Sequence, residues 1–278
     1  MTTGNASRFS LYAGLALATV LFGARAEYAA GLRIAIAVAL PAAIALAAWK
    51  TGARALKSAD ADQQRLATAG CLLILPFAAF ALLAGYGRPD QATHAQNQSR
   101  YVALLINAIA VGGGLALLAA ALRDAQERFL STLGLAAILF ATPVYLVWAA
   151  LCFEIHRVLA AVGPGGAVPA WLNALNDLSD VLLFFGGALT YAATAALAAA
   201  AGRAKWLGRR TARAYVIAGA VALLCLALRG LRFPDPAEVF KHAYAIPGFV
   251  AGIPAVPWIM PCLIGVSLLR RAGEGRQK

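Results

Sequence analysis

The stretch Tyr101–Leu122, YVALLINAIAVGGGLALLAAAL, contains no charged residue and a single amide, Asn107. About 20 apolar residues in a helix are needed to cross the roughly 30 Å hydrocarbon core of a bilayer. This run therefore predicts a membrane-spanning helix. The whole chain has the same character, since 62% of its residues are hydrophobic and only 13% are charged, against about 45–50% and about 25% in soluble domains.

Similar apolar runs recur along the chain on both sides of Tyr101–Leu122. Together they predict an all-α, polytopic membrane helical bundle of about eight transmembrane helices. The expected helices cover approximately Phe9–Ala24, Leu32–Trp49, Leu66–Gly85, Tyr101–Leu122, Phe129–Leu151, Leu172–Ala201, Ala214–Leu228 and Ile246–Leu269.

The connectors between these runs alternate between rich and poor in basic residues. Lys and Arg that flank spans are retained on the cytoplasmic side, which predicts that both termini are cytoplasmic, in a bacterial-type inner membrane. The expected inner segments then hold most of the basic residues: Arg8, Lys50, Arg54, Lys57, Arg65, Arg123, Arg128, Arg203, Lys205, Arg209, Arg210, Arg213, Arg270, Arg271, Arg276 and Lys278.

The net charge of +12 is explained by this topology, so a nucleic-acid partner is not expected. Membrane lipids with anionic headgroups are the expected partners, and a homo-oligomer or a larger membrane complex stays open. No cofactor is expected. The predicted spans contain no lysine for a retinal Schiff base and no histidine for haem, and the chain has no P-loop.

Short matches between the two halves of the chain indicate an internal duplication. Arg8–Ala16 resembles Arg128–Ala136, and Ala69–Gly70 resembles Ala218–Gly219 at a larger offset. Because each half would hold four spans, the copies would share one orientation, as a parallel 4+4 repeat. The alternative is chance similarity between Ala- and Leu-rich helices.

The repeat predicts a first four-helix membrane half at residues 1–127 and a second at residues 128–278. The change in offset between the matches locates an insertion in the second half, at about residues 152–179, on the expected outer side. A GPGG sequence at residues 163–166 predicts a turn within it.

The insertion concentrates polar residues near the expected outer surface. Glu154 and Arg157 follow the fifth span, whereas Asn176, Asp177 and Asp180 form a polar stripe at the start of the sixth. One interpretation is a solvated helix start, where acidic residues are favourable. The other is an acidic vestibule on a ligand or ion pathway, in which Asp180 lies deepest.

A weaker hypothesis is a metal site on the same side. His156 lies in the insertion, and Glu238 and His242 are four residues apart before the last span. Imidazole and carboxylate groups are zinc ligands. The chain lacks the dense ligand spacing of known zinc motifs, so surface histidines are the competing interpretation.

Small residues indicate where helices approach one another closely. Gly112 and Gly113 lie in the fourth span, Gly186 lies in the sixth, and Gly248 and Gly252 are four apart in the last. Such positions allow close packing of membrane helices. These glycines are the expected packing faces.

The last span is also the richest in proline, with Pro247, Pro254, Pro257 and Pro261. Proline removes a backbone donor and kinks or breaks a helix. A broken helix is tolerated in a membrane only where protein or a water-filled cavity satisfies the freed carbonyls. The sequence thus predicts an irregular last helix.

The favoured function is an integral membrane protein that works as a small transporter or channel with an outward-facing acidic vestibule. One alternative is a membrane-embedded enzyme acting on lipid-type substrates at the outer face. The other is an accessory or structural subunit of a membrane complex. An enzyme is the less favoured class, since no catalytic motif is found.

Overall fold

The computed structural model describes residues 3–23, 28–87, 89, 92–163, 166–167, 169–231 and 246–274. Every regular element in these ranges is helical. The elements are α1 (Thr3–Gly23), α2 (Ala30–Thr51), the 3-10 helix η1 (Ala53–Lys57), α3 (Ala61–Leu82), α4 (His94–Asp124), α5 (Phe129–Val162), α6 (Ala170–Arg203), α7 (Arg209–Gly230), α8 (Pro247–Gly252) and α9 (Ala255–Glu274).

Seven helices of the described ranges, α2 to α7 and α9, are long and apolar enough to cross a membrane. This architecture fits a multi-pass integral membrane protein. The sequence predicted about eight spans, and the first of these, α1, is not among the seven. Although α1 has 21 residues, its first turns carry polar Asn5, Ser7, Arg8 and Ser10.

The helices form two compact units. The first contains residues 1–121 and 261–278, and the second contains residues 122–260. The expected halves, 1–127 and 128–278, differ from this division mainly in the last helix, whose larger part belongs to the first unit. The internal repeat stays a prediction.

The first unit is built around α3, which packs closely against α4 and the later part of α9. Leu73 of α3 is fully buried, and it occupies the space that a side chain at Gly114 of α4 or Gly265 of α9 would need. A Cβ atom on Gly70 would lie 2.8 Å from the Gly265 carbonyl oxygen. Glycines on both helices therefore bring the α3 and α9 backbones together.

The other contacts of α3 are aromatic and polar. Phe22 of α1 stacks on Phe80 of α3, with ring centroids 4.2 Å apart. Asn107, which is fully buried in α4, donates its amide hydrogen to the Pro76 carbonyl of α3 at 3.5 Å. A buried amide without a partner would be costly in an apolar interior, so this bond links the two helices.

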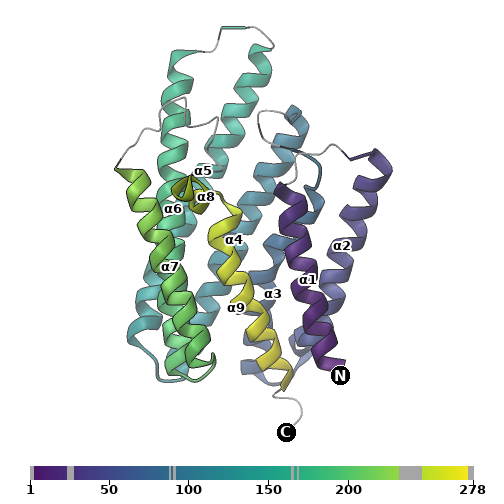
Figure 1. Cartoon of the computed structure of the whole chain (residues 1–278), viewed down its shortest axis with the longest axis vertical. Coiled ribbons are helices and arrows are strands. Elements are labelled where there is room, and N and C mark those ends of the chain that lie inside the picture. Colours follow the sequence, from purple (N-terminus) through teal and green to yellow (C-terminus); the bar gives the residue numbers. More distant parts are fainter. Residues whose placement is uncertain are drawn as a thin grey trace. The chain divides into compact units, whose positions relative to one another are not determined.

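The second unit is dominated by α5 and α6, which run side by side as a long hairpin (Figure 1). Each has 34 residues, which gives about 51 Å at 1.5 Å per residue, well beyond the roughly 30 Å of hydrocarbon. Most of the predicted insertion at residues 152–179 is therefore helical. The fifth helix continues past Leu151 to Val162, and it ends at Gly163, whose φ of 72° suits glycine at a helix end.

The last predicted span is interrupted, as its prolines predicted. The short helix α8 ends at Gly252, and α9 begins at Ala255 after Ile253 and Pro254. Pro261 lies inside α9. The backbone carbonyls at the end of α8 consequently need partners from outside that helix.

We expect Gly52→Ala to destabilise the first unit and Gly31→Ala to leave it unchanged or slightly more stable. A Cβ atom on Gly52 would clash with the Leu269 backbone carbonyl of α9, whereas nothing lies within 4 Å of one on Gly31. Overpacking of this kind costs about 1–3 kcal/mol. The measurement is the apparent melting temperature of each purified variant in one detergent, and equal melting temperatures would contradict the close α9 contact.

Candidate functional site

A buried arginine marks the polar centre of the second unit. Arg229 lies in the last turn of α7, and only 4% of its side chain is exposed. A guanidinium stays charged at any physiological pH, and an uncompensated buried charge costs several kcal/mol. The groups around Arg229 must therefore balance its charge.

The acidic partner of Arg229 is Asp180 of α6. Asp180 Oδ2 lies 4.0 Å from Arg229 Nη2, and 31% of the Asp180 side chain is exposed. This distance is an ion pair rather than a direct hydrogen bond. The pair is asymmetric, because water can reach the carboxylate but hardly reaches the guanidinium.

The short helix α8 packs against the same arginine. The ring centroid of Phe249 lies 5.1 Å from Arg229 Cζ, in a cation–π contact. A side chain at Gly248 would clash with the Cys225 carbonyl of α7, and a Cβ atom at Gly252 would lie 3.2 Å from Arg229 Nη1. The two glycines are four residues apart and share a helix face, so they allow α8 to lie against α7.

The interruption after α8 is bridged by a tyrosine from α6. The Tyr191 hydroxyl donates a hydrogen bond to the Ala251 carbonyl at 3.0 Å. Ala251 belongs to the end of α8, where carbonyls lack helical partners. Tyr191 and Ala251 are buried together with Leu226 and Met260. The break is therefore held in a packed protein environment, as a membrane requires.

The length of α6 predicts that Asp180 and Arg229 lie near one membrane boundary. The axis of α6 between Asp180 and Arg203 is about 35 Å long at 1.5 Å per residue, slightly more than the roughly 30 Å of hydrocarbon. The connected ends of α5 and α6 extend beyond the end of α7 (Figure 1). The pair thus sits where one end of the unit meets water.

The structure brings only one residue of the predicted vestibule to Arg229. Glu154 and Arg157 of α5 instead bind each other through two hydrogen bonds of 2.6 and 2.7 Å, and both side chains are about half exposed. Asn176 and Asp177 are exposed on α6. Of the predicted vestibule residues, only Asp180 forms an ion pair with Arg229.

The hypothetical metal ligands are not brought together among the described residues. His156 Nδ1 lies 2.9 Å from the Cys152 carbonyl one turn earlier in α5. Glu238 and His242 lie outside the described residues. Within the described ranges, no three His, Cys, Asp or Glu side chains are close enough to hold a metal ion. The zinc-type site stays a prediction.

The sequence interpretation missed Arg229 and Tyr191. Arg229 directly follows the predicted seventh span, Ala214–Leu228, and Tyr191 lies inside the predicted sixth span. A signal for the ion pair did exist. Asp180 of α6 and Arg229 of α7 lie at similar distances from the connector that joins these two antiparallel helices, and their charges are opposite.

Comparison of the chain with known protein families, with characterised proteins and with solved structures gave no match. Function is therefore argued from the site itself. The site offers a fixed buried cation, a carboxylate open to water and an interrupted helix beside them. Such an arrangement can exchange one anion for another at Arg229.

We expect Asp180→Asn to destabilise the protein more than Arg229→Met, and the double variant to recover most of the loss. Asp180→Asn leaves the buried guanidinium without its carboxylate, and breaking a buried pair this way costs up to about 3–5 kcal/mol. Arg229→Met leaves a carboxylate that water can still reach.

Apparent melting temperatures in detergent measure this double-mutant cycle. Glu154→Gln, which breaks the exposed pair with Arg157, is the matched control, and we expect no measurable change from it. Strict additivity of Asp180→Asn and Arg229→Met would show that the two side chains do not interact.

Proposed function

We propose that this protein is a small membrane transporter for organic anions, with its substrate site at Arg229. The observation that carries the proposal is the asymmetric pair of buried Arg229 and half-exposed Asp180 beside the interruption between α8 and α9. Ionisable groups within membrane helices commonly mark ion and substrate pathways. Discontinuous helices commonly form the binding sites of secondary transporters.

The asymmetry of the pair favours an anion over a cation as substrate. A cation that took Asp180 would remove the carboxylate that pairs with the buried guanidinium, and breaking a buried pair in this way is costly. An anion that took Arg229 would release Asp180, whose exposed carboxylate water can hydrate. A carboxylate also matches the planar, two-pronged donor geometry of arginine.

Within the predicted acidic vestibule, the proposal gives the functional role to one residue, Asp180. The charge of Glu154 is balanced by Arg157, which leaves Asp177 and Asp180 as the acidic residues of the stripe on α6. Asp180 acts as the resident counter-ion that a substrate displaces. When the substrate displaces Asp180 from Arg229, the Asp180 carboxylate becomes an unpaired negative charge in water. Substrate binding thereby changes the charge at this end of α6.

The transport test is uptake of radiolabelled acetate, lactate and succinate into proteoliposomes, measured against empty liposomes. We expect at least one of these carboxylates to enter faster with the wild-type protein. Arg229→Gln should lower that uptake by at least about tenfold, since loss of a buried charged partner costs 2–5 kcal/mol or more. Arg229→Lys keeps the charge but loses the planar fork, so its uptake should be intermediate.

Arg157→Gln is the matched control, because it also removes an arginine paired with an acid, but at an exposed position. We expect wild-type uptake from it. The anion-transporter proposal would be refuted if Arg229→Gln left uptake unchanged. It would also be refuted if liposomes with the wild-type protein took up the carboxylates no faster than empty liposomes.

We also propose that both termini are cytoplasmic in a bacterial-type inner membrane, on the strength of the charge distribution. The exposed residues Ala160, on the α5 part of the hairpin, and Thr211, at the start of α7, are suitable reporters. Each is replaced by cysteine in a variant without the four native cysteines. A membrane-impermeant maleimide should label Ala160→Cys in intact bacterial cells and Thr211→Cys only in inverted vesicles, and the reverse pattern would overturn this orientation.

A second candidate function, an accessory subunit of a membrane complex, is favoured by a different observation. A hollow of about 390 Å³ between α1 and α2 is lined by apolar side chains, including Leu17, Leu21 and Ile36. Only 17% of the apolar stretch of α2 is buried. A partner helix would find a complementary surface there.

A further inference from the structure

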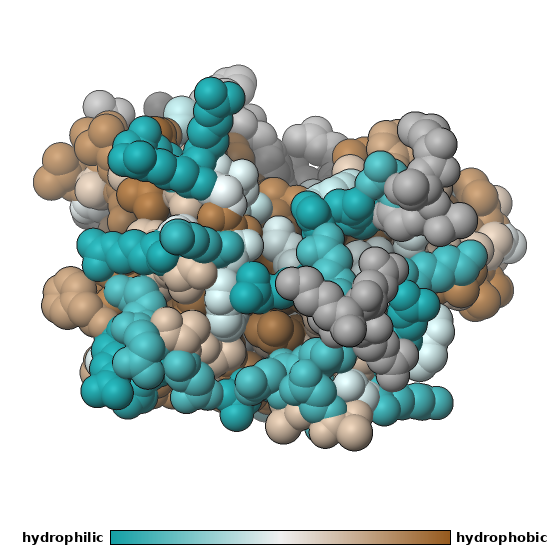
Figure 2. All heavy atoms as spheres, turned by 90° about the horizontal axis from the view of Figure 1, so that it is seen from below, coloured by the Kyte–Doolittle hydropathy of each residue, from teal (hydrophilic) through white to brown (hydrophobic). Residues whose placement is uncertain are grey.

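The connector between α6 and α7 borders an open pocket that the anion site does not involve. Its volume is about 1020 Å³, at the upper end of the roughly 300–1000 Å³ typical of small-ligand pockets. The connector between α6 and α7 lies at the lower end of both helices in Figure 1, and Arg229 lies in the last turn of α7, at the other end of that helix. Figure 2, seen from below, shows many hydrophilic residues interspersed with hydrophobic ones at the lower ends of the helices.

The wall of this pocket is basic at one end and apolar at the other. On α7, Arg209 and Arg213 are followed by Val216 and Ile217, at spacings that place all four on one helix face. Val216 and Ile217 are exposed, although they are large and hydrophobic. Their depth below Arg209 is about 10–12 Å at 1.5 Å per residue, which extends from the headgroup level into the hydrocarbon.

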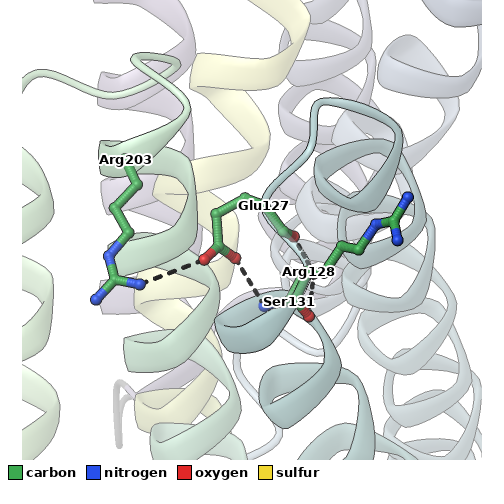
Figure 3. Close-up of polar contacts among 4 residues, drawn as sticks. All are labelled: Glu127, Arg128, Ser131 and Arg203. Atoms are coloured by element: carbon green, nitrogen blue, oxygen red, sulfur yellow. Dashed lines mark hydrogen bonds and ion pairs between the residues drawn. The ribbon is translucent and has the colours of Figure 1, made fainter.

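One of the four cations in the wall is already neutralised. Arg203 Nη1 lies 3.5 Å from Glu127 Oε1, and Glu127 Oε2 accepts the backbone N–H of Ser131 at 3.1 Å (Figure 3). Only 10% of the Glu127 side chain is exposed. Glu127 is therefore committed to Arg203 and to the first turn of α5.

The other three cations have no acidic partner among the residues that the structure describes. Within the described part of the chain, no carboxylate forms an ion pair with Lys205, Arg209 or Arg213. All three are exposed. Three uncompensated positive charges around one hollow attract an anion, and the apolar wall beneath them selects one that carries a hydrocarbon chain.

Lys205 also occupies a position that local structure would give to glycine. Its φ is 58°, in the left-handed region. Trp206 N–H donates to the Ala201 carbonyl at 2.8 Å and closes the end of α6 around it. Glycine is the usual residue at such a helix end. A lysine there keeps a charge on the rim of the pocket at the expense of backbone strain.

We propose that this pocket binds an anionic phospholipid, with the phosphate among Lys205, Arg209 and Arg213 and an acyl chain along Val216 and Ile217. Trp206, which also lines the pocket, supplies the amphipathic ring that favours the membrane interface. The site is independent of the transport proposal, since its residues lie at the opposite end of α6 from Asp180.

The test is lipid binding to the purified protein in detergent, followed by native mass spectrometry. Dioleoylphosphatidylglycerol is the probe, and dioleoylphosphatidylcholine is the zwitterionic reference. We expect phosphatidylglycerol to bind at least about fivefold more tightly, and each pocket charge removed to weaken its binding by about fivefold. The pocket variant is Arg209→Gln with Arg213→Gln.

The matched control removes the same charge outside the pocket. Arg210 adjoins Arg209 in sequence but does not line the pocket, and Arg54 is an exposed residue of η1. Arg210→Gln with Arg54→Gln should bind phosphatidylglycerol as the wild type does. Equal loss in the control and the pocket variants, or equal binding of the two lipids by the wild type, would overturn the proposal.

Lys205→Gly separates binding from folding. Glycine relieves the left-handed backbone, so the melting temperature should stay the same or rise while phosphatidylglycerol binding falls about fivefold. Unchanged lipid binding by this variant would exclude Lys205 from the site. Inorganic phosphate is added as a competitor, and displacement of the lipid by millimolar phosphate would assign the pocket to a free phosphate and refute a lipid site.

Discussion

The thickness of the hydrocarbon core, about 30 Å, is the constraint on which the second unit depends. Charged side chains are stable at the two boundaries and costly between them. Along α6 the charged residues obey this rule, with Asp180 near one boundary and Arg203 near the other, about 35 Å apart. The intervening stretch from Val181 to Gly202 carries no charge. The Arg229–Asp180 pair and the basic pocket at the other end of α6 are consequently separated by about the thickness of one bilayer.

The same constraint explains why the helical architecture was largely predictable from the sequence. Runs such as Tyr101–Leu122 and Phe129–Leu151 contain no charged residue, and helices cover them in the structure. The interruption of the last span followed from Pro254 and its neighbouring prolines. The end of α5 at Val162 was less predictable, because residues beyond the bilayer are free of the rule that marks a span.

The candidate site was only partly predictable, since it depends on contacts between helices. Asp180 was singled out by its depth in the sixth span, but nothing in the local sequence states that Arg229 is buried. That burial results from Gly248 and Gly252, which let α8 cover the guanidinium. The sequence indicated that these glycines are packing positions. Only the structure shows that they pack against α7 and Arg229. The left-handed backbone at Lys205 likewise carries no sequence signature.

The first unit is discontinuous in sequence, and this has a consequence for biogenesis. Leu73 is enclosed by Gly114 of α4 and by Gly265 of α9, yet the whole second unit, residues 122–260, is synthesised between these two glycines. At roughly 5–20 residues per second, α3 waits on the order of ten seconds or more in the membrane before Gly265 exists. During that interval the α3 face around Gly70 lacks its α9 contacts. The unit that begins the chain is thus the last to be completed.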